Sequence, residues 1–323
     1  MVDRVVEALK QRARIGDAAA LTEFGKRLLV GDGVPANPQE GLALITQAAN
    51  RDHAEAVGQL ALFAAWGVLQ PRNIHQALER LARAAALGSA AAQHELQFLA
   101  RETGTDWDAL RRNVSVDDWT RARPPQVVCE NPLIRVLQDF LSPEECRWVI
   151  ARGGAMERAK IYRKDAPGLA VEQSRTNTES SFDVRHADIV ISLIRERIAN
   201  SVGVAASYFE IAKLLHYSPG EQFGLHADFL DVRNPVLARE VAQYGQRVST
   251  FLVYLNDDFE GGETDFPRID YRFKGRTGDA LLFRNVDAAD QPDLNTTHAG
   301  LPPTRGEKWL LSQWIRNKPI GGG

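Results

Sequence analysis

The chain has 323 residues and a formal net charge of -3, from 39 basic and 42 acidic side chains. Its hydrophobic fraction of 44% and charged fraction of 25% are ordinary for a globular protein, which excludes a disordered, collagen-like or coiled-coil chain. This length predicts about two domains. The absence of a long basic block argues against a nucleic-acid partner. Only two cysteines occur, Cys129 and Cys146, which excludes a disulfide scaffold and favours a reducing compartment.

The first residues carry charges throughout, so they do not form the apolar core of a signal peptide. The longest apolar stretch, residues 60–69, is half of the roughly 20 residues that a membrane-spanning helix needs. We therefore expect a cytoplasmic protein that makes no membrane contact.

An internal repeat occupies the first hundred residues, which are rich in Ala and Leu. A period of 34 to 36 residues with two helix patterns per unit is typical of a helix-turn-helix solenoid. The segment Gly31-Asp32-Gly33-Val34-Pro35 predicts the break between the two helices of the first unit. A third unit begins near Ala92. The residues that recur 36 positions later are Asn37 and Asn73, Leu42 and Leu78, and Ala48-Ala49 and Ala84-Ala85.

Residues 28–34, followed by Gln47-Ala48-Ala49, resemble the Sel-like subclass of tetratricopeptide repeats. The resemblance implies a helical repeat domain over 1–103. Two roles stay open for it: a docking surface for a protein or peptide, or a helical cap that stiffens or dimerises the second domain. Residues 1–100 carry ten basic and ten acidic side chains, so we expect shape and apolar contact to hold any partner.

The polar stretch 104–131 is predicted to be a linker with one or two short helices. After it, Ser142-Pro143-Glu144-Glu145 is typical of a helix start, with Ser at the N-cap and Pro at the first position. A second helical pattern covers 185–199. Many short strands in the remainder predict a barrel or sandwich covered by helices, over 132–319. The strand-like runs are Phe209–Tyr217, Val248–Leu255, Ala280–Phe283 and Trp309–Ile315.

Two His-x-Asp triplets differ in their predicted backbone. His186-Ala187-Asp188 lies in a helical pattern, where residues two apart diverge, so we interpret His186 as a helix-surface residue. His226-Ala227-Asp228 follows a strand, and in an extended segment residues i and i+2 project from the same face. His298 follows another apolar strand and is the candidate third ligand. Two His and one carboxylate hold Fe(II) with three open positions, whereas a tetrahedral zinc site would use the same ligands with one open position.

Lys308 favours iron among these two metals. It lies ten residues after His298, on a predicted strand that could place one ammonium deep in the barrel. Such a group is a suitable partner for the distal carboxylate of 2-oxoglutarate.

Together these motifs resemble the prolyl 4-hydroxylase-like family of Fe(II)/2-oxoglutarate dioxygenases. The resemblance covers about 133–316. It implies a double-stranded β-helix, or jelly roll, with supporting helices, and the cofactors Fe(II), 2-oxoglutarate and O2, with ascorbate as a candidate reductant. The matching residues are His226-x-Asp228, Gly261-Gly262-Glu263-Thr264-x-Phe266-Pro267, Gly278-Asp279-Ala280, His298-Ala299-Gly300 and Lys308-Trp309.

The resemblance also implies roles for individual residues. The catalytic metal ligands would be His226, Asp228 and His298, and Lys308 would bind the 2-oxoglutarate carboxylate. Tyr217 and Thr250 match positions that assist Lys308, and Trp314 matches an aromatic residue near the pocket.

On the substrate side, Ser174-Arg175-Thr176-Asn177 matches a mobile family segment that is usually Arg-Thr-Ser, so Asn177 is a departure. Arg175 and Asn177 are predicted to contact substrate, and Glu210 is a further candidate. The stretch Leu230–Gln246 is longer than in the collagen-type enzymes and could form a different lid.

The leading functional hypothesis is hydroxylation of proline, or a proline-like residue, in a peptide or protein, with succinate and CO2 as co-products. A free cyclic amino acid of the proline or pipecolate type is the alternative substrate. A non-enzymatic protein-binding module with an inert barrel is the alternative of another class. A zinc hydrolase is disfavoured, because no general base can be assigned.

Overall fold

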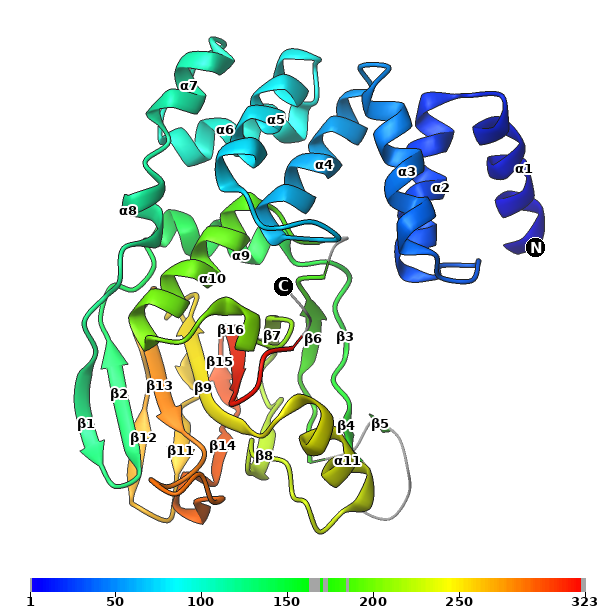
Figure 1. The fold of residues 1–323 in the computed structure, drawn as a ribbon. Coiled ribbons are helices and arrows are strands. Elements are labelled where there is room, and N and C mark those ends of the chain that lie inside the picture. Colours follow the sequence, from blue (N-terminus) through cyan, green and yellow to red (C-terminus); the bar gives the residue numbers. More distant parts are fainter. Residues whose placement is uncertain (1, 163–168, 171–173, 184–185, 321–323) are drawn as a thin grey trace. The chain divides into compact units, whose positions relative to one another are not determined.

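The structure is a computed structural model that describes residues 2–162, 169–170, 174–183 and 186–320 (Figure 1). It contains two compact units. The first runs to Thr120 and includes Ala187–Ile194, and the second comprises Arg121–His186 and the chain from Arg195 onward. Among the described residues, none of the helices combines the length and apolarity that crossing a bilayer requires.

The first unit consists of helices in antiparallel succession. Helices α2, α4 and α6 begin at 36-residue intervals, as do α3 and α5, which confirms the predicted repeat. The helices are α1 (Val2–Arg14), α2 (Ala18–Val30), α3 (Pro38–Ala49), α4 (Ala54–Trp66), α5 (Ile74–Ala86), α6 (Ala90–Ala100), α7 (Trp107–Asn113) and α8 (Val116–Thr120).

Equivalent residues end and begin the helices of successive repeats. Gly31 and Gly67 end α2 and α4 in the left-handed conformation, with φ of 77° and 71°. Such a φ is unfavourable for residues with a Cβ atom. Asn37 and Asn73 are the N-caps of α3 and α5, and each side chain accepts a hydrogen bond from the backbone three residues on. The predicted break between the first two repeat helices is therefore confirmed, with its chemistry repeated in the next unit.

The segment predicted as a linker, 104–131, contains α7, α8 and the first strand, β1 (Gln126–Glu130). The division between the compact units falls inside it, after Thr120. Trp119 explains why the first part joins the helical unit. Its ring is 2% exposed, and its indole N–H donates to the carbonyl of Leu99 at 2.9 Å.

Three helices contribute to the second unit, and the longest of them has 14 residues. Helix α9 (Pro143–Arg152) begins with the predicted capping box, formed by Ser142 and Glu145. Helix α10 (Ile189–Val202) begins later than the predicted residue 185, which itself lies outside the described residues. Asp188 of the first His-x-Asp triplet accepts from the backbone N–H of Ile191 at 2.7 Å, so its carboxylate caps the helix. The interpretation of His186 as a helix-surface residue was therefore wrong, because His186 lies in a turn before α10. Helix α11 is Pro235–Tyr244, and η1 and η2 are Ala206–Tyr208 and Leu294–Thr296.

Two antiparallel sheets form the body of this unit (Figure 1). The larger has the order β1-β2-β13-β9-β16-β7-β6-β3, and the smaller has the order β12-β11-β14-β8. The pairs β10-β15 and β4-β5 are separate. The remaining strands are β2 (Leu133–Leu137), β3 (Glu157–Arg158), β4 (Ile161–Tyr162), β5 (Leu169–Ala170), β6 (Thr178–Ser181), β7 (Lys213–Tyr217), β8 (Phe223–His226), β9 (Arg247–Tyr254), β10 (Glu260–Gly261), β11 (Thr264–Phe266), β12 (Tyr271–Phe273), β13 (Ala280–Arg284), β14 (His298–Gly300), β15 (Pro303–Arg305) and β16 (Lys308–Arg316).

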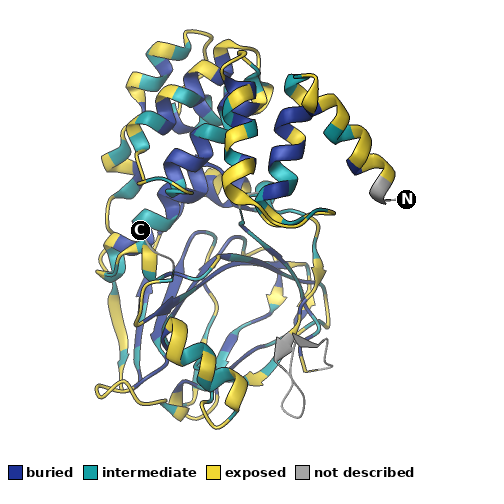
Figure 2. Ribbon diagram, turned by 45° about the vertical axis from the view of Figure 1, so that its right-hand side comes forward, coloured by how far each residue is buried: buried dark blue, intermediate teal, exposed yellow. Residues whose placement is uncertain are grey.

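The sheets enclose an apolar core, and Figure 2 shows the central strands as largely buried. One core cluster joins Leu252 and Leu281 of the larger sheet to Phe266 of the smaller one. This arrangement confirms the predicted jelly roll, which follows the helical repeat region in the sequence. One boundary was wrong: the strand predicted over Phe209–Tyr217 begins at Lys213, because η1 and a single bridge at Phe209 precede it.

Candidate active site

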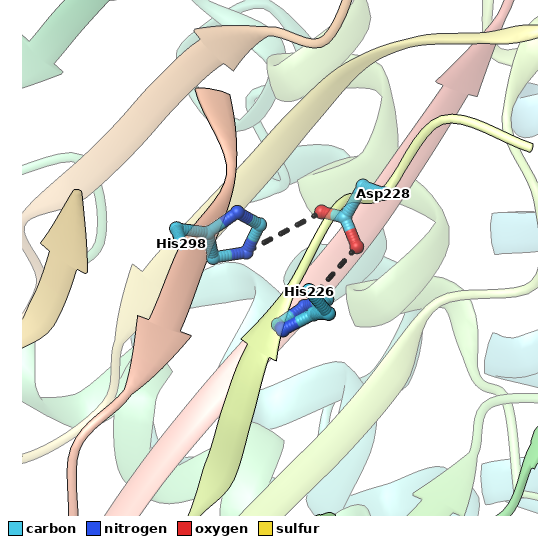
Figure 3. Close-up of side chains that lie close together, drawn as sticks. All are labelled: His226, Asp228 and His298. Atoms are coloured by element: carbon cyan, nitrogen blue, oxygen red, sulfur yellow. Dashed lines mark ion pairs between the residues drawn. The ribbon is translucent and has the colours of Figure 1, made fainter. Parts of the chain in front are cut away.

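Three predicted ligands meet between the two sheets (Figure 3). His226 ends β8 and lies directly opposite His298 of β14 in the strand register. Asp228 follows two residues after His226, and its two oxygens lie 3.5 Å from Nε2 of His226 and 3.7 Å from Nε2 of His298. One ligand atom from each residue lies within 4.8 Å of the others. Ligands adjacent in a coordination sphere of about 2.1 Å radius lie about 3 Å apart, so a small inward movement would hold one ion.

Backbone carbonyls orient both imidazoles. Nδ1 of His226 lies 2.8 Å from the oxygen of Gly224, and Nδ1 of His298 lies 2.9 Å from the oxygen of Thr296. A carbonyl only accepts, so each Nδ1 carries the hydrogen and each Nε2 keeps its lone pair toward Asp228. This assignment of the tautomers aims Nε2 of both rings at one point.

The charge state of these three groups suits a divalent cation. Asp228 is 5% exposed. Although burial alone would raise its pKa, the neighbouring His226, His298 and Thr250 hold the pKa of Asp228 well below its usual value. Burial, with His226 nearby, lowers the pKa of His298 to about 4 against the opposing effect of Asp228. The site therefore combines one carboxylate with unprotonated imidazole, which are the forms that bind metal.

Thr250 supports the carboxylate from below. Its hydroxyl donates to Oδ2 of Asp228 at 2.6 Å, and it also accepts from the amide of Asn285 at 3.0 Å. The prediction placed Thr250 beside Lys308 as a cofactor residue. In the structure Thr250 is not among the residues that line the pocket; it fixes the orientation of Asp228 instead. The register explains this position, because Thr250 of β9 pairs with Trp314 of β16 and not with Lys308.

Lys308 lies at the deep end of the pocket. Its side chain is fully buried, and Nζ has no hydrogen-bond partner among the described residues. The rings of Tyr217 and Tyr254 lie 5.0 and 5.2 Å from Nζ. Burial lowers the pKa of Lys308 to about 7, which Glu263 partly opposes. A buried ammonium without a partner is costly, so the geometry fits a carboxylate that enters with a ligand.

Two hydroxyl side chains line the pocket together with this lysine. Tyr217 pairs directly with Lys308 across β7 and β16, and burial raises its pKa to about 12, so it stays a neutral donor. Thr264 lines the pocket at 2% exposed, and its hydroxyl lies 2.8 Å from that of Tyr254. Sequence reasoning assigned no role to Thr264, although the Gly-Gly-Glu-Thr motif that contains it was the available signal.

Arg175 and Phe223 form one wall beside the metal ligands. The Phe223 ring stacks on His226 with ring centroids 3.4 Å apart and planes 9° apart. The guanidinium of Arg175 lies 4.3 Å from the centre of the Phe223 ring. Arg175 is 3% exposed and lines the pocket, as predicted for a residue on the substrate side. Phe223 was not predicted, since its stacking depends on a register irregularity between β8 and β14.

Two predicted substrate residues lie outside the pocket lining. Asn177 is fully buried and accepts from Nε of Arg175 at 3.1 Å, so it positions that guanidinium instead. Glu210 forms ion pairs with Arg247 at 2.6 Å and Arg316 at 2.7 Å. Burial alone would raise the pKa of Glu210, but these two arginines hold that pKa below its usual value. Its carboxylate is therefore committed to structure. Trp314, in contrast, does line the pocket.

The long stretch 230–246 contains α11 and is closed at its base by one amide. Gln246 accepts from the backbone N–H of Leu230 at 2.7 Å and donates to the carbonyl of the same residue at 2.8 Å. Glu240 of α11 also pairs with Arg316 of β16. These bonds hold the two ends of the stretch together and tie α11 to β16.

The pocket opens to solvent, and the space not filled by atoms in it and at its mouth amounts to about 440 Å³. The donor set at one place and the unpartnered ammonium at another fit Fe(II) and the distal carboxylate of 2-oxoglutarate. The lining residues are Arg175, Leu215, Tyr217, Phe223, His226, Asp228, Leu252, Thr264, His298, Gly300, Lys308, Leu310, Ser312 and Trp314.

Comparison with known proteins agrees with this chemistry. Residues 212–316 match the 2OG-Fe(II) oxygenase superfamily. The chain is 35% identical over 213 residues to prolyl 4-hydroxylase 1 of Arabidopsis thaliana, an alignment that covers 60% of this chain and 72% of that protein. Among solved structures, the viral collagen prolyl hydroxylase of Paramecium Bursaria Chlorella virus-1 is similar over 58% of this chain and 98% of its own, with 25% identity and a TM-score of 0.42. The Sel1 repeat protein of Oxalobacter formigenes is similar over 34% of this chain and 88% of its own, with 23% identity and a TM-score of 0.30.

The fold and the pocket define a 2-oxoglutarate-dependent dioxygenase, and the cofactors of this class are Fe(II), 2-oxoglutarate and O2. Within that class, the chain belongs to the prolyl 4-hydroxylase family, with helical repeats at its N-terminal side. It is therefore an enzyme, and the alternative of an inert binding module is set aside.

Proposed function

We propose that this enzyme hydroxylates a proline residue in a peptide or protein and converts 2-oxoglutarate to succinate and CO2. The observation that carries the proposal is the unpartnered Lys308 in the same pocket as His226, Asp228 and His298. A zinc hydrolase would have no use for a buried ammonium at that position. The relatives named above are prolyl 4-hydroxylases, which supports a proline residue as the target.

The protein supplies binding and orientation in this reaction. His226, Asp228 and His298 would hold Fe(II) on one face and leave the opposite face to ligands. When bound, the iron and 2-oxoglutarate together supply the oxidising power for an unactivated C–H bond. Lys308 would fix the distal carboxylate of 2-oxoglutarate through a charge-assisted hydrogen bond, with Tyr217 and Thr264 beside it.

The remaining side chains govern where the substrate lies. Thr250 holds Asp228 in one orientation, and Phe223 covers one face of the His226 ring. Apolar residues such as Leu215, Leu252 and Leu310 line the pocket, which keeps water from the reacting carbon. No side chain has to act as a general base, which agrees with the absence of an unpaired carboxylate among the described lining residues.

Turnover with a defined panel tests the proposal. The purified protein with Fe(II), 2-oxoglutarate and ascorbate is given proline-containing peptides, free proline and free pipecolate, while succinate and a mass gain of one oxygen atom are measured. We expect both products to rise together with at least one peptide, and to vanish under argon. Mass gain on the free amino acids alone would contradict a peptidyl substrate, and absence of succinate in every arm would contradict the enzymatic function.

A further inference from the structure

A cluster of charged side chains includes Arg175, which lines the pocket, and two cations beside the pocket residue Trp314. Glu179 accepts from Arg175 at 2.7 Å and from Lys213 at 2.6 Å. Glu210 accepts from both Arg247 and Arg316, and Glu240 pairs with Arg316 as well. Four cations thus share three carboxylates in these contacts, namely Arg175, Lys213, Arg247 and Arg316 with Glu179, Glu210 and Glu240.

Trp314 connects this cluster to the pocket that it lines. The ring of Trp314 has the Arg247 guanidinium 3.7 Å and the Lys213 ammonium 5.6 Å from its centre. These two cations come from β9 and β7, the strands on either side of β16 (Figure 1). They therefore approach the indole from two neighbouring strands.

This positive region is separate from the one that would hold 2-oxoglutarate. Lys308 and Trp314 lie six residues apart on β16, which corresponds to roughly 20 Å along an extended strand. A five-carbon diacid is much shorter than that distance. One molecule of 2-oxoglutarate on Lys308 therefore leaves the charges around Trp314 to the substrate.

Lys213 is the cation with the most capacity for a new partner. Of its three N–H donors, one is used by Glu179, and its side chain is 23% exposed. Arg175 already directs three donors at protein oxygens and is 3% exposed. Burial lowers the pKa of Lys213, and although Glu179 opposes this, Arg175 and Arg247 lower it further. An incoming anion would relieve this mutual repulsion.

We propose that the substrate carries a carboxylate close to the target proline, and that Lys213 binds this carboxylate beside Trp314. The inference rests on the proposed hydroxylation of a proline residue and specifies its substrate class. The carboxylate could belong to a neighbouring Asp or Glu side chain or to a chain end at the proline. Charge-assisted hydrogen bonds are roughly twice as strong as neutral ones, so this contact is enough to discriminate among peptides.

Binding to protein that cannot turn over separates this idea from the hydroxylation itself. The full chain is loaded with Mn(II) and 2-oxoglutarate, and dissociation constants are measured by calorimetry for three short proline peptides. The first is blocked at both ends with Gln next to proline, the second has Glu in place of Gln, and the third is the Gln peptide with a free C-terminal carboxylate at the proline. We expect the second or third to bind about tenfold tighter than the first, and the stronger of them identifies the source of the carboxylate.

Variants at Lys213 make the test specific. In Lys213→Met the advantage of the acidic peptide should disappear, and in Lys213→Arg it should be retained. Arg239→Met is the matched control, because Arg239 is an exposed cation on α11, and it should keep the full preference. Equal affinity for all three peptides, failure of every peptide to bind, or loss of the preference in Arg239→Met would each overturn the proposal. This binding test is independent of the turnover test described above. A peptide that binds with the expected preference but is not hydroxylated in the turnover test would refute only the proposed reaction.

Discussion

A buried ammonium without a hydrogen-bond partner lowers the stability of a fold, because it loses its hydration and regains nothing. Lys308 is in this situation among the described residues, and it faces two tyrosine rings rather than an anion. The pocket is thus arranged to bind a ligand carboxylate, and this arrangement lowers the stability of the ligand-free protein. Two experiments at the scale of single residues follow from this.

The affinity for 2-oxoglutarate should depend on pH. Burial lowers the pKa of Lys308 to about 7, and only the protonated form attracts the carboxylate. Binding to the Mn(II)-loaded protein should therefore be constant below about pH 7 and weaken about tenfold per pH unit above it. In Lys308→Arg, whose guanidinium does not titrate in this range, the decline should be absent. A wild-type affinity that stays flat up to about pH 9 would remove the titrating lysine from the site.

Lys308→Met should change the stability of the protein and its affinity for 2-oxoglutarate in opposite directions. Removal of the buried charge should raise the free energy of unfolding of the ligand-free protein by about 1–3 kcal/mol, while the 2-oxoglutarate requirement rises. Urea unfolding and 2-oxoglutarate binding measure the two effects on one sample. A variant that is both less stable and unchanged in 2-oxoglutarate binding would show that Lys308 is a packing residue.

Thr250 should influence metal affinity without touching the metal. Thr250→Val removes the hydroxyl that donates to Asp228 and keeps the shape of the side chain. Loss of such a supporting bond lowers metal affinity by about 10- to 100-fold. Thr277→Val is the matched control, since Thr277 donates to the exposed Asp257 at 2.9 Å. Competition with a coloured chelator measures both variants, and equal affinities would contradict the supporting role.

At the scale of elements, local sequence pattern predicted the positions that depend on one strand and missed those that depend on strand pairing. His226 and Asp228 follow from the two-residue period of extended chain. His298 was predicted as well, from the apolar strand before it, whereas the position of Thr250 beneath Asp228 rather than beside Lys308 is decided by the register of distant strands.

Dependence on distant strands also explains why Glu210 was wrongly predicted to contact the substrate. A carboxylate next to a predicted strand could equally face the substrate or an arginine. The choice is made by Arg247 and Arg316, which lie 37 and 106 positions away in the chain. Helix starts were more predictable, because a capping box such as that of Ser142 and Glu145 is local.

Glu145 also joins two helices, and this gives a prediction for the fold. Its carboxylate accepts both terminal nitrogens of Arg197 in α10 at 2.8 and 2.9 Å, and both side chains are buried. Glu145→Ala would remove the carboxylate that faces both terminal nitrogens of the buried guanidinium, so we expect a loss of about 3–5 kcal/mol in unfolding free energy. Glu144→Ala, at the exposed neighbouring position, should cost less than about 1 kcal/mol. Urea unfolding compares them, and similar losses would contradict the structural role of the pair.

At the scale of the whole molecule, α10 belongs to both compact units. Its first residues cluster with the helical repeats, and the rest belong to the oxygenase unit. The indole of Trp66 donates to the carbonyl of Asp188 at 2.9 Å, and the hydroxyl of Ser192 donates to that of Ala65 at the same distance. The apolar residues of this stretch that are at most 1% exposed are Ile189, Val190, Ile191, Leu193 and Ile194.

Removal of the repeats should therefore harm the oxygenase unit itself. A fragment of residues 121–323 would keep Ala187–Ile194 but lose the helices with which this stretch forms one compact unit, and burial of an apolar side chain contributes about 1.5–3 kcal/mol. We expect the fragment to aggregate or to unfold at a markedly lower temperature. The matched control begins at Asp17 and loses α1, and it should stay as soluble as the full chain. A soluble, fully stable 121–323 fragment would instead favour repeats that serve only for docking.

The central claim is that His226, Asp228 and His298 bind Fe(II) and that 2-oxoglutarate joins it in the same pocket. Anaerobic titration of the full chain with Fe(II) and 2-oxoglutarate, followed by visible absorption, tests it most directly. We predict a weak charge-transfer band that saturates at one iron per chain, with no band in Asp228→Ala and an unchanged band in Asp257→Ala, which alters an exposed carboxylate. No band in the wild-type chain, or an equal band in Asp228→Ala, would contradict the account.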